Sequence, residues 1–319
     1  MMRRLTETQK KWLAERFKNQ VWFNAPLASR TSFHIGGPAE ALVTPENRDE
    51  LFALVTGARD RGLGYQVFGG GTNLLVTDQG ISGLVIRIAR CLDTIEAAEE
   101  PPDGFRVRVG AGVTLRRFCR YCLSHGLKGM NFAIGIPGTV GGALTMNAGT
   151  GAGSMTDGLC SLMLLMGSGG VRGVERDLIL SGHRSLTWRL AGEEADASHP
   201  AVILGGEFLL ARGEAAELKA EARGIMIARK MSQPIGFPSA GCIFKNPPDG
   251  APAGRLIDMA GLKGRRQGGA VISERHANYI VNTGGATAAD VLSLMNLVKE
   301  TVWNRFQIQL EPEVKVVGD

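Results

Sequence analysis

Residues 132–149 read FAIGIPGTVGGALTMNAG, a stretch in which glycines and a proline interleave with apolar residues. No charged residue occurs from Asn131 to Gly153. Solvated loops are seldom so apolar, because loop backbone normally runs over the surface among polar side chains. The segment suits buried backbone that packs against a large flat ligand, and a glycine-lined crossover inside the core is the alternative.

A second glycine-rich segment lies upstream, where residues 67–76 read VFGGGTNLLV. We expect an apolar strand on each side of the three glycines. Consecutive glycine amides can form a concave anion-binding nest, and the missing side chains let a phosphate approach the backbone. The pattern is neither the dinucleotide fingerprint, which opens a helix, nor a Walker loop, which needs Gly-Lys-Thr. From the residues alone, a phosphate-binding nest and a tight glycine hairpin both stay open.

The composition describes a globular chain that binds small molecules. Its 319 residues include 44 glycines without a three-residue period, which excludes collagen, and the 44% hydrophobic content excludes a disordered chain. The net charge is +5 and the sequence pI is about 9.1, but the cations do not cluster beyond the short run at residues 263–266. Aromatic residues amount to only 6%, so few platforms exist for stacking bases. A nucleic-acid partner is therefore disfavoured. The charge fits either a mildly basic protein with mixed charges or a protein that binds anionic small molecules.

Five cysteines are present, and an odd number in a chain of this length does not suggest a disulfide framework. Cys119 and Cys122 fit the apolar side of an expected helix, and no second pair completes a zinc site, so we expect no metal. The first residues contain no apolar signal segment, and no apolar run reaches the ~18 residues of a membrane span. These patterns predict a cytoplasmic protein without membrane insertion.

Helix and strand signals are mixed along the chain. Asn47, Thr114 and Thr287 each precede an expected helix and can act as its N-cap. The strands and helices do not alternate regularly, so an α+β architecture is favoured over a doubly wound sheet.

Two further segments carry chemically capable side chains. Residues 233–247, QPIGFPSAGCIFKNP, place Cys242 after a glycine and near Lys245. Such a cysteine is either accessible with a lowered pKa or a buried free thiol, and the second is the commoner fate. Residues 310–314, LEPEV, put Glu311 and Glu313 on one face of an expected strand. That arrangement is either a carboxylate pair for acid–base work or a solvated strand end.

Taken together, these segments resemble the UDP-N-acetylenolpyruvoylglucosamine reductase family of flavoenzymes, from about Pro26 to Gly318. Any one block is moderately specific, and all of them in this order are highly specific. The short substrate loop resembles the family's second type, which lacks an extra Tyr-bearing insertion. The blocks that carry the resemblance are TSF and IGGPA within 31–39, GGTN at 70–73, GIPGTVGG and MNAG within 135–149, PSAG and FKNP within 238–247, HAN at 276–278, and Glu313-Val314.

The resemblance implies an α+β fold with a two-lobed FAD-binding domain of the vanillyl-alcohol-oxidase (PCMH) type and a smaller α+β substrate-binding domain. The boundaries that we expect are a lead-in helix over 1–25, the FAD-binding domain over 26–212 and the substrate-binding domain over 213–319. The two lobes of the FAD-binding domain should cover about 26–95 and 96–212.

The resemblance also implies FAD as cofactor and NADPH as co-substrate. In the implied step of peptidoglycan precursor synthesis, NADPH passes a hydride to FAD. Reduced FAD passes a hydride to the enol-ether carbon of UDP-N-acetylglucosamine enolpyruvate, and protonation of the neighbouring carbon gives UDP-N-acetylmuramate. A cytoplasmic monomer is expected. The alternatives are another FAD-dependent oxidoreductase of the same fold and a flavin-binding protein without catalysis.

By motif position, the resemblance implies site residues in three groups. The catalytic residues are Arg189, Cys242 and Glu313. The substrate-binding residues are Arg229, Lys245 and Asn246. The FAD contacts are Ile35, Gly36, Gly37, Phe68, Gly69, Gly70, Gly71, Thr72, Asn73, Leu74, Gly135, Ile136, Pro137, Gly138, Thr139, Gly141, Gly142, Ala143, Met146, Asn147, Ala148 and Gly149.

The chain departs from the family pattern at two places, Cys242 and Asn131, and the motif leaves a choice between two arginines. Cys242 stands where the family usually has a serine as proton donor, and a thiol with a pKa of ~8.5 can also donate a proton. The same thiol should make the protein sensitive to alkylation. Arg184 competes with Arg189 for the place of the active-site arginine, and Arg189 is preferred for its distance to the strand near Val202. Asn131 stands where many relatives carry glutamate, and its role is open.

Overall fold

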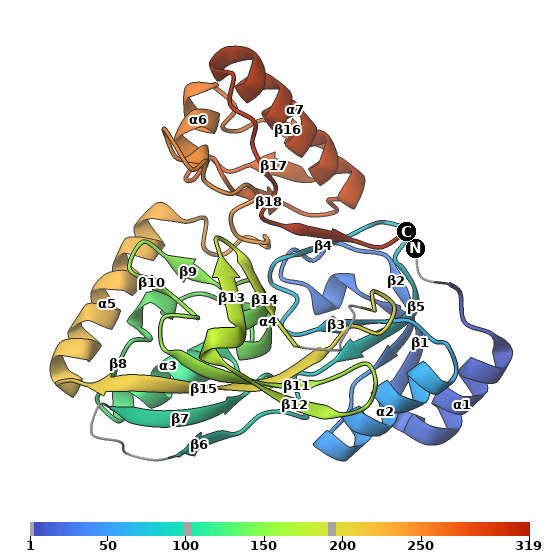
Figure 1. The fold of residues 1–319 in the computed structure, drawn as a ribbon. Helices are drawn as coiled ribbons and strands as arrows, with labels where there is room; N and C mark the ends of the chain where they lie inside the picture. The colour runs from blue at the N-terminus through green and yellow to red at the C-terminus, as the bar shows by residue number, and fades with distance from the viewer. Residues whose placement is uncertain (1–2, 99–103, 191–195) are drawn as a thin grey trace.

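The structure is a computed structural model that describes residues 3–98, 104–190 and 196–319. Figure 1 shows two lobes side by side and a smaller C-terminal unit above them. The α-helices are α1 (Glu7–Phe17), α2 (Arg48–Asp60), α3 (Leu115–Ser124), α4 (Val140–Thr145), α5 (Ala215–Ser232), α6 (Ala253–Met259) and α7 (Ala288–Phe306). The strands are β1 (Val21–Pro26), β2 (Pro38–Val43), β3 (Tyr65–Phe68), β4 (Leu74–Val76), β5 (Ile81–Arg87), β6 (Ile95–Ala97), β7 (Phe105–Gly110), β8 (Leu127–Lys128), β9 (Gly149–Thr150), β10 (Gly153–Ser154), β11 (Leu159–Leu165), β12 (Val171–Glu175), β13 (Ile179–Gly182), β14 (Ser185–Trp188), β15 (Val202–Arg212), β16 (Arg266–Gln267), β17 (Ala270–Ile272), β18 (Ile280–Asn282) and β19 (Lys315–Val317).

The first lobe is a four-stranded sheet in the order β1-β2-β5-β3 with α1 and α2 beside it. The β1–β2 pair is antiparallel, whereas β5 runs parallel to both β2 and β3. Asn47 caps α2, because its side chain accepts a hydrogen bond from the Glu50 N–H. Leu51, Leu54 and Val55 of α2 are fully buried in the core. The amphipathic pattern of this helix therefore fixes it to the sheet.

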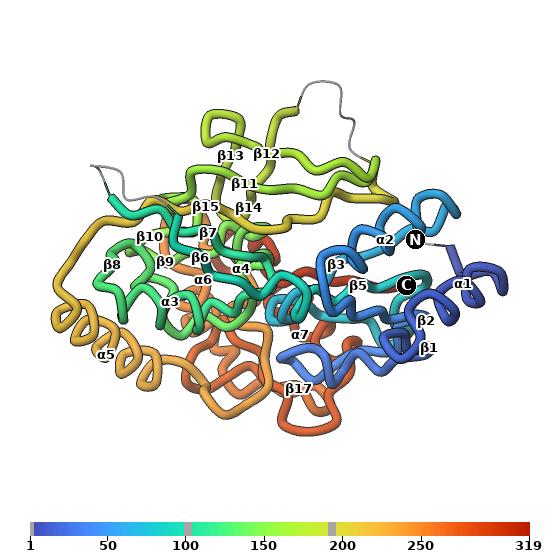
Figure 2. Tube along the Cα trace, turned by 90° about the horizontal axis from the view of Figure 1, so that it is seen from below, coloured from blue at the N-terminus to red at the C-terminus, as the bar shows by residue number. Residues whose placement is uncertain are grey.

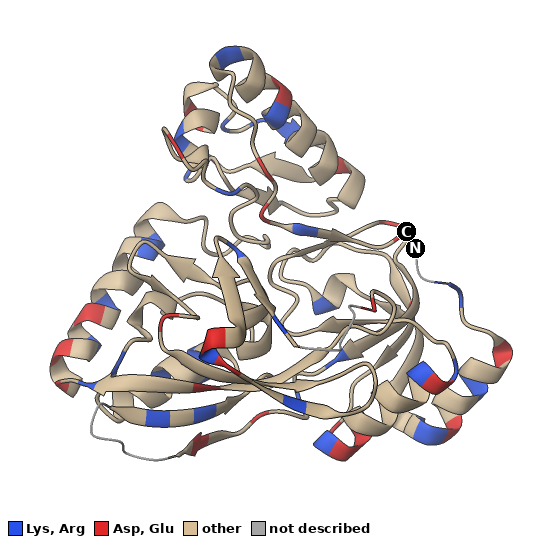
Figure 3. Cartoon of the chain, viewed as in Figure 1, with Lys and Arg blue, Asp and Glu red and all other residues tan. Residues whose placement is uncertain are grey.

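The second lobe is an antiparallel sheet in the order β12-β11-β15-β7-β6, with β8 also paired to β15. Thr114 caps α3 as expected, and Cys119 and Cys122 of this helix are buried core residues. Figure 2 shows the strands of this lobe and α3 in separate layers. Charges of both signs are interspersed on α1, α2 and α5 (Figure 3).

The C-terminal unit packs α6 and α7 on the antiparallel sheet β16-β17-β18. Thr287 begins α7 with a capping box that Asp290 completes. After α7 the chain returns to the first lobe, where β19 pairs in parallel with β4. Phe33, Ile35 and Leu75 belong to the same buried cluster as α7. The unit therefore rests on the first lobe through shared core residues as well as through β19.

Helix α5 belongs by its packing to the second lobe. Ala222 joins the core of the two lobes, and Ile225 and Met226 pack against that core. The buried cluster of the C-terminal unit takes up the chain again only at Ala240. The expected boundary at residue 213 therefore precedes a helix that packs on the two lobes, and the C-terminal core begins after this helix. The expected α+β class is confirmed.

None of the helices in the described part of the chain combines the length and the apolar character that crossing a membrane requires.

Candidate active site

Two glycine loops meet where the lobes face each other. The first glycine loop (residues 69–73) connects β3 to β4, and the second glycine loop (residues 135–139) leads into α4. The Thr72 hydroxyl donates a hydrogen bond of 3.3 Å to the Pro137 carbonyl. A Cβ on Gly70 would lie 2.8 Å from the Gly138 Cα. The loops therefore touch backbone to backbone, an approach that glycine alone permits.

The cysteine-bearing segment (residues 238–247) runs beside residues 311–313, which precede β19. The Glu313 N–H donates to the Ile243 carbonyl at 2.7 Å, and the Lys245 N–H donates to the Glu311 carbonyl at 2.9 Å. Asn73 of the first glycine loop donates from Nδ2 to the Glu313 carbonyl at 3.0 Å. Backbone pairing thus brings Cys242, Glu313 and the first glycine loop to one place, although 240 residues separate Asn73 from Glu313.

Buried Asn278 holds the cysteine-bearing segment from its other side. Its Oδ1 accepts a hydrogen bond of 3.0 Å from the Phe244 N–H, and its Nδ2 donates one of 2.8 Å to the Phe244 carbonyl. The Ile243 N–H donates to the Asn278 carbonyl at 2.9 Å. The side-chain amide of Asn278 thus bonds the Phe244 backbone as a neighbouring strand would. The Asn278 carbonyl holds Ile243, the residue after Cys242.

Replacing Asn278 with alanine should therefore destabilise the C-terminal unit. Both backbone groups of buried Phe244 would lose their partner, at roughly 2 to 4 kcal/mol together. The free energy of unfolding from denaturant titration measures the effect, with Asn304→Ala on the exposed side of α7 as the matched control. Equal stability of the two variants would contradict this role of Asn278.

Four polar side chains surround the Cys242 thiol. Burial raises the pKa of this thiol to about 11, and the nearby Glu313 carboxylate adds to the rise. Arg184, a side-chain hydrogen bond with Tyr279, and Arg229 act in the opposite direction. Burial also raises the pKa of the Tyr279 hydroxyl. The thiol thus keeps its proton at neutral pH although two arginines lie close to it.

Of the two arginines in competition, the structure brings Arg184 to Glu313. Its Nε donates to Glu313 Oε1 at 2.5 Å, and the two side chains are only 21% and 17% exposed. Arg184 lies in the two-residue turn between β13 and β14, with a left-handed φ of 60°. Arg189 follows β14 with an exposed side chain, and its N–H donates to the Leu178 carbonyl. The structure therefore places Arg184, rather than the preferred Arg189, beside Glu313, and the active-site role of either arginine stays a prediction.

Arg229 reaches the same place from the last turn of α5. A Cβ on Gly135 would lie 2.8 Å from the Arg229 Cδ, so the arginine stem lies on the second glycine loop. Because Arg229 also influences the Cys242 thiol, it connects this loop to the cysteine. The position that the sequence indicated for a substrate contact is thus near enough for its charge to act on the candidate proton donor.

The other two expected substrate contacts have partners within the protein. Lys245 Nζ lies 3.3 Å from Glu311 Oε2 in a partly exposed ion pair. Asn246 Oδ1 accepts a hydrogen bond of 3.1 Å from the Ala253 N–H at the start of α6. The structure also indicates a role for Asn131. Its Nδ2 donates a hydrogen bond of 2.6 Å to Glu221 Oε2, which links residues 131–133 to α5.

Several of the remaining expected FAD contacts pack against other parts of the protein. Gly36 and Gly37 pack against β4 and the turn after it, where a Cβ would lie 2.6 Å from Val76 Cβ and 2.3 Å from the Asp78 carbonyl oxygen. Ile35 is buried in the C-terminal core. Asn147 has a left-handed φ of 40°, and its side chain bonds Thr156 and the Gly182 carbonyl. Asn147 therefore connects the end of α4 to the hairpin that carries Arg184.

A cavity of about 520 Å³ opens beside the two glycine loops, a size typical of small-molecule sites. Gly70, Thr72 and residues 136–139 line one side of it. The other side carries arginines, which the sequence analysis did not single out: Arg87, Arg116, Arg117 and Arg120. The Arg87 Nε is buried and has no hydrogen-bond partner among the described residues. Glycine amides and arginine side chains fit a ligand with a diphosphate, as FAD has.

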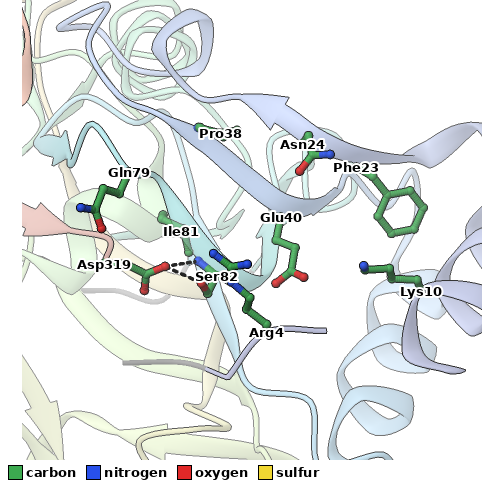
Figure 4. Close-up of a pocket in the computed structure, with 10 residues that line it drawn as sticks. All are labelled: Arg4, Lys10, Phe23, Asn24, Pro38, Glu40, Gln79, Ile81, Ser82 and Asp319. Carbon is green, nitrogen blue, oxygen red and sulfur yellow. Dashed lines mark hydrogen bonds between the residues drawn. The ribbon is translucent and has the colours of Figure 1, made fainter. Parts of the chain in front are cut away.

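A second cavity, of about 380 Å³, is lined by residues of the first sheet such as Phe23, Pro38 and Ile81 (Figure 4). Its carboxylates are engaged: Glu40 accepts hydrogen bonds from the Leu5 and Gly83 N–H groups. Asp319 accepts from the Ser82 N–H at 3.1 Å. These contacts hold the N-terminal segment and the end of β19 on the sheet, so a structural role accounts for them.

Sequence reasoning missed Tyr279 and Arg87. Tyr279 lies directly after the HAN block at 276–278, so its position next to a family motif was a usable signal. Arg87 ends a strand of ordinary apolar pattern, and no local motif marks it.

Comparison with known families identifies the class of the chain. Residues 39–174 match the FAD binding domain family, and this range includes both glycine loops. The two-lobed fold and the paired loops agree with that match. The chain is thus an FAD-binding protein of this fold.

The C-terminal unit narrows the class to one family. Residues 233–317 match the family described as UDP-N-acetylenolpyruvoylglucosamine reductase, C-terminal domain. The reductase of that name from Desulfosudis oleivorans is 45% identical over 97% of this chain and 98% of its own length. The one from Geobacter metallireducens is 43% identical over 96% and 97%. The crystal structure of the Thermus caldophilus reductase superposes with a TM-score of 0.75 at 36% identity, covering 91% of this chain and 97% of that one. The chain belongs to the UDP-N-acetylenolpyruvoylglucosamine reductase family and is an FAD-dependent oxidoreductase.

Proposed function

We propose that this chain catalyses the NADPH-dependent reduction of UDP-N-acetylglucosamine enolpyruvate to UDP-N-acetylmuramate, with Cys242 as the proton donor. The observation that carries the proposal is that backbone pairing brings Cys242 and Glu313 to the first glycine loop, where Arg184 pairs with Glu313 and Arg229 lies on the second glycine loop. Bound FAD would supply the hydride carrier between NADPH and the enol ether.

The side chains of the cluster have distinct tasks in this proposal. Hydride addition to the enol ether leaves negative charge next to the substrate carboxylate. Arg184 and Arg229 are preorganised cations that stabilise this charge. Cys242 then transfers its proton to the neighbouring carbon, which completes the reduction. Glu313 orients Arg184 through their ion pair and disfavours the thiolate by its own charge.

An anaerobic visible spectrum of the purified protein tests the function. Addition of NADPH should bleach the yellow flavin, and addition of UDP-N-acetylglucosamine enolpyruvate should restore it. Bleaching without recovery would refute the substrate assignment and favour another oxidoreductase of this fold. Failure to bleach with NADPH would refute the co-substrate assignment.

The cluster also predicts a pH dependence for alkylation of Cys242. Only the thiolate reacts with iodoacetamide, and a pKa of about 11 leaves very little thiolate at neutral pH. Labelling should therefore be slow at neutral pH and accelerate as the pH rises towards about 11. We therefore expect the protein to be sensitive to alkylation at Cys242 only under alkaline conditions. Mass spectrometry of the labelled peptide over time gives the rate.

Glu313→Gln is the matched variant for this measurement. Removing the carboxylate removes a negative charge that opposes the thiolate, so the rise in labelling should move to lower pH. Fast labelling of the unaltered protein at neutral pH, or an unchanged profile in the variant, would contradict the described environment of the thiol.

A cytoplasmic monomer belongs to the same proposal. Cys242, Glu313, Arg184 and Arg229 all come from one chain, so the cluster needs no second copy. NADPH and a nucleotide-linked sugar are metabolites of the cytoplasm, which supports that location.

A further inference from the structure

Arg184, the partner of Glu313, lies at the tip of the β13–β14 hairpin, so its position depends on what holds this hairpin. Within the described part of the chain, β13 and β14 form a sheet of two strands with no third neighbour. A two-stranded hairpin on its own is only marginally stable in water. Contacts with the rest of the protein therefore determine where the tip lies.

The side-chain amide of Asn147 anchors the hairpin close to its tip. Asn147 follows α4 and is buried, and its Nδ2 donates a hydrogen bond of 3.1 Å to the carbonyl of Gly182. Gly182 is the last residue of β13, two residues before Arg184. Figure 1 shows the hairpin beside α4. The bond therefore fixes the backbone immediately before the turn that carries the arginine.

The partners of this amide allow only one orientation. Asn147 Oδ1 accepts hydrogen bonds from the hydroxyl of buried Thr156 at 3.1 Å and from its backbone N–H at 3.3 Å. A backbone N–H can only donate, so the amide oxygen faces Thr156. The Gly182 carbonyl can only accept, so the NH₂ group faces the hairpin. Asn147 thus connects the end of α4 to the hairpin in a single arrangement.

Backbone conformation on both sides of the bond indicates that this junction is precisely determined. Asn147 has a left-handed φ of 40° and Arg184 one of 60°. Residues other than glycine seldom adopt this conformation, and they keep it where the surrounding structure determines it, often at functional sites. One hydrogen bond and the two steps of chain after Gly182 connect these two residues.

We propose that Asn147 is a positioning residue for reduction of the substrate, because its amide holds the hairpin so that Arg184 meets Glu313 and the charge that develops on the substrate. The inference rests on the proposed function and deepens it by assigning a residue that acts through Arg184. Helix α4 has six residues and Thr139 at its other end caps it, so about 9 Å of helix separates Asn147 from the second glycine loop. The arginine and this loop therefore keep one relative position.

The test uses the holoenzyme and two variants. Asn147→Gly removes the amide and tolerates the left-handed backbone. Thr156→Val removes only the hydroxyl that orients the amide, so it tests the same idea with a smaller change. Asn24→Gly is the matched control, because Asn24 is also a left-handed asparagine, with a φ of 49°, but lies on β1 in the first lobe. The visible spectrum gives the flavin content of each protein.

The first readout is the rate at which the substrate reoxidises the reduced flavin. Asn147→Gly should slow this step by roughly 10- to 10²-fold, since a misplacement of about 1 Å has effects of that size. Thr156→Val should slow it less, and Asn24→Gly should leave it unchanged. In a protein that already carries Arg184→Met, adding Asn147→Gly should slow the step by less than about two-fold. Independent, multiplying effects of the two changes would overturn the proposal, because Asn147 would then not act through Arg184.

The second readout requires no turnover. The charge of Arg184 lowers the pKa of the Cys242 thiol, so an arginine that has moved away leaves less thiolate at a given pH. At a fixed alkaline pH below about 11, iodoacetamide should label Cys242 more slowly in both Asn147→Gly and Arg184→Met. A roughly ten-fold decrease is expected, at the low end for loss of a neighbouring charge.

This labelling separates the inference from the proposed function. Unchanged labelling in Asn147→Gly would overturn the inference, and loss of flavin with unchanged labelling would assign Asn147 to the cofactor instead. Slower labelling in a protein family member that fails to reduce the substrate would support the placement of Arg184 by Asn147 and refute the proposed function alone.

Discussion

Cys242→Ala should leave the bleaching of the flavin by NADPH intact and slow the return of yellow colour on substrate addition by roughly 10²- to 10⁴-fold. That range is the usual contribution of a general acid. The reason is local, because the thiol is the protonated group between Glu313 and the two arginines, and alanine has no proton to give. Stopped-flow absorbance under anaerobic conditions, with each half-reaction started separately, measures both rates.

Cys242→Ser is the matched control for this prediction. A hydroxyl also carries a transferable proton and fits the space of the thiol, so substantial activity should remain. The flavin spectrum and the melting temperature of the alanine variant are compared with those of the unaltered protein. Equal values show that the slower reaction does not come from misfolding. An alanine variant with normal return of colour would show that another group, with Tyr279 the nearest candidate, supplies the proton.

Arg184→Met should slow reduction of the substrate by roughly 10²- to 10³-fold, whereas Arg189→Met should change it little. A loss of roughly 10²- to 10³-fold is typical when one group that stabilises developing negative charge is removed. Arg184 is paired with Glu313 in the half-buried cluster, while the Arg189 side chain is exposed beyond β14. Five residues separate the two arginines, so the pair of variants tests position with matched chemistry. The rate of flavin reoxidation by the substrate is the readout.

Arg184→Lys completes the comparison. It keeps the charge but loses the planar fork that meets a carboxylate, so an intermediate rate is expected. If Arg189→Met proved the more damaging change, the assignment of Arg184 to the cluster would be wrong.

Local signals predicted local structure well. Asn47, Thr114 and Thr287 cap the helices that were expected after them, because an N-cap is decided by a side chain and a backbone amide only three residues away. The two glycine segments were likewise recognisable, since a glycine run has few structural uses. The irregular order of helix and strand signals favoured the α+β class, and the resemblance to a family added the two-lobed FAD-binding architecture.

Contacts between distant segments were the part that the sequence could not determine. The choice between Arg184 and Arg189 depended on a two-residue turn that holds Arg184 at positive φ. His183 and Arg184 are not typical turn residues, so the turn had no clear signal. A non-glycine residue in this conformation costs roughly 1 to 2 kcal/mol and persists where its surroundings determine it, often at functional sites. The sequence could not predict that the Arg87 Nε lacks a hydrogen-bond partner among the described residues, because this depends on the positions of groups from distant segments.

The pairing of β19 with β4 also sets an order of events during protein synthesis. Glu313 follows Asn73 by 240 residues, and at ~5–20 residues per second the ribosome needs roughly 12 to 48 s to make that length. During this interval β4 lacks its partner strand, and a bare strand edge invites pairing with other chains. A nascent chain whose lobes have already captured flavin would accept electrons without being able to pass them on productively, because the carboxylate of the cluster has yet to emerge. Chaperone protection of the β4 edge should therefore matter most late in translation, until β19 closes it.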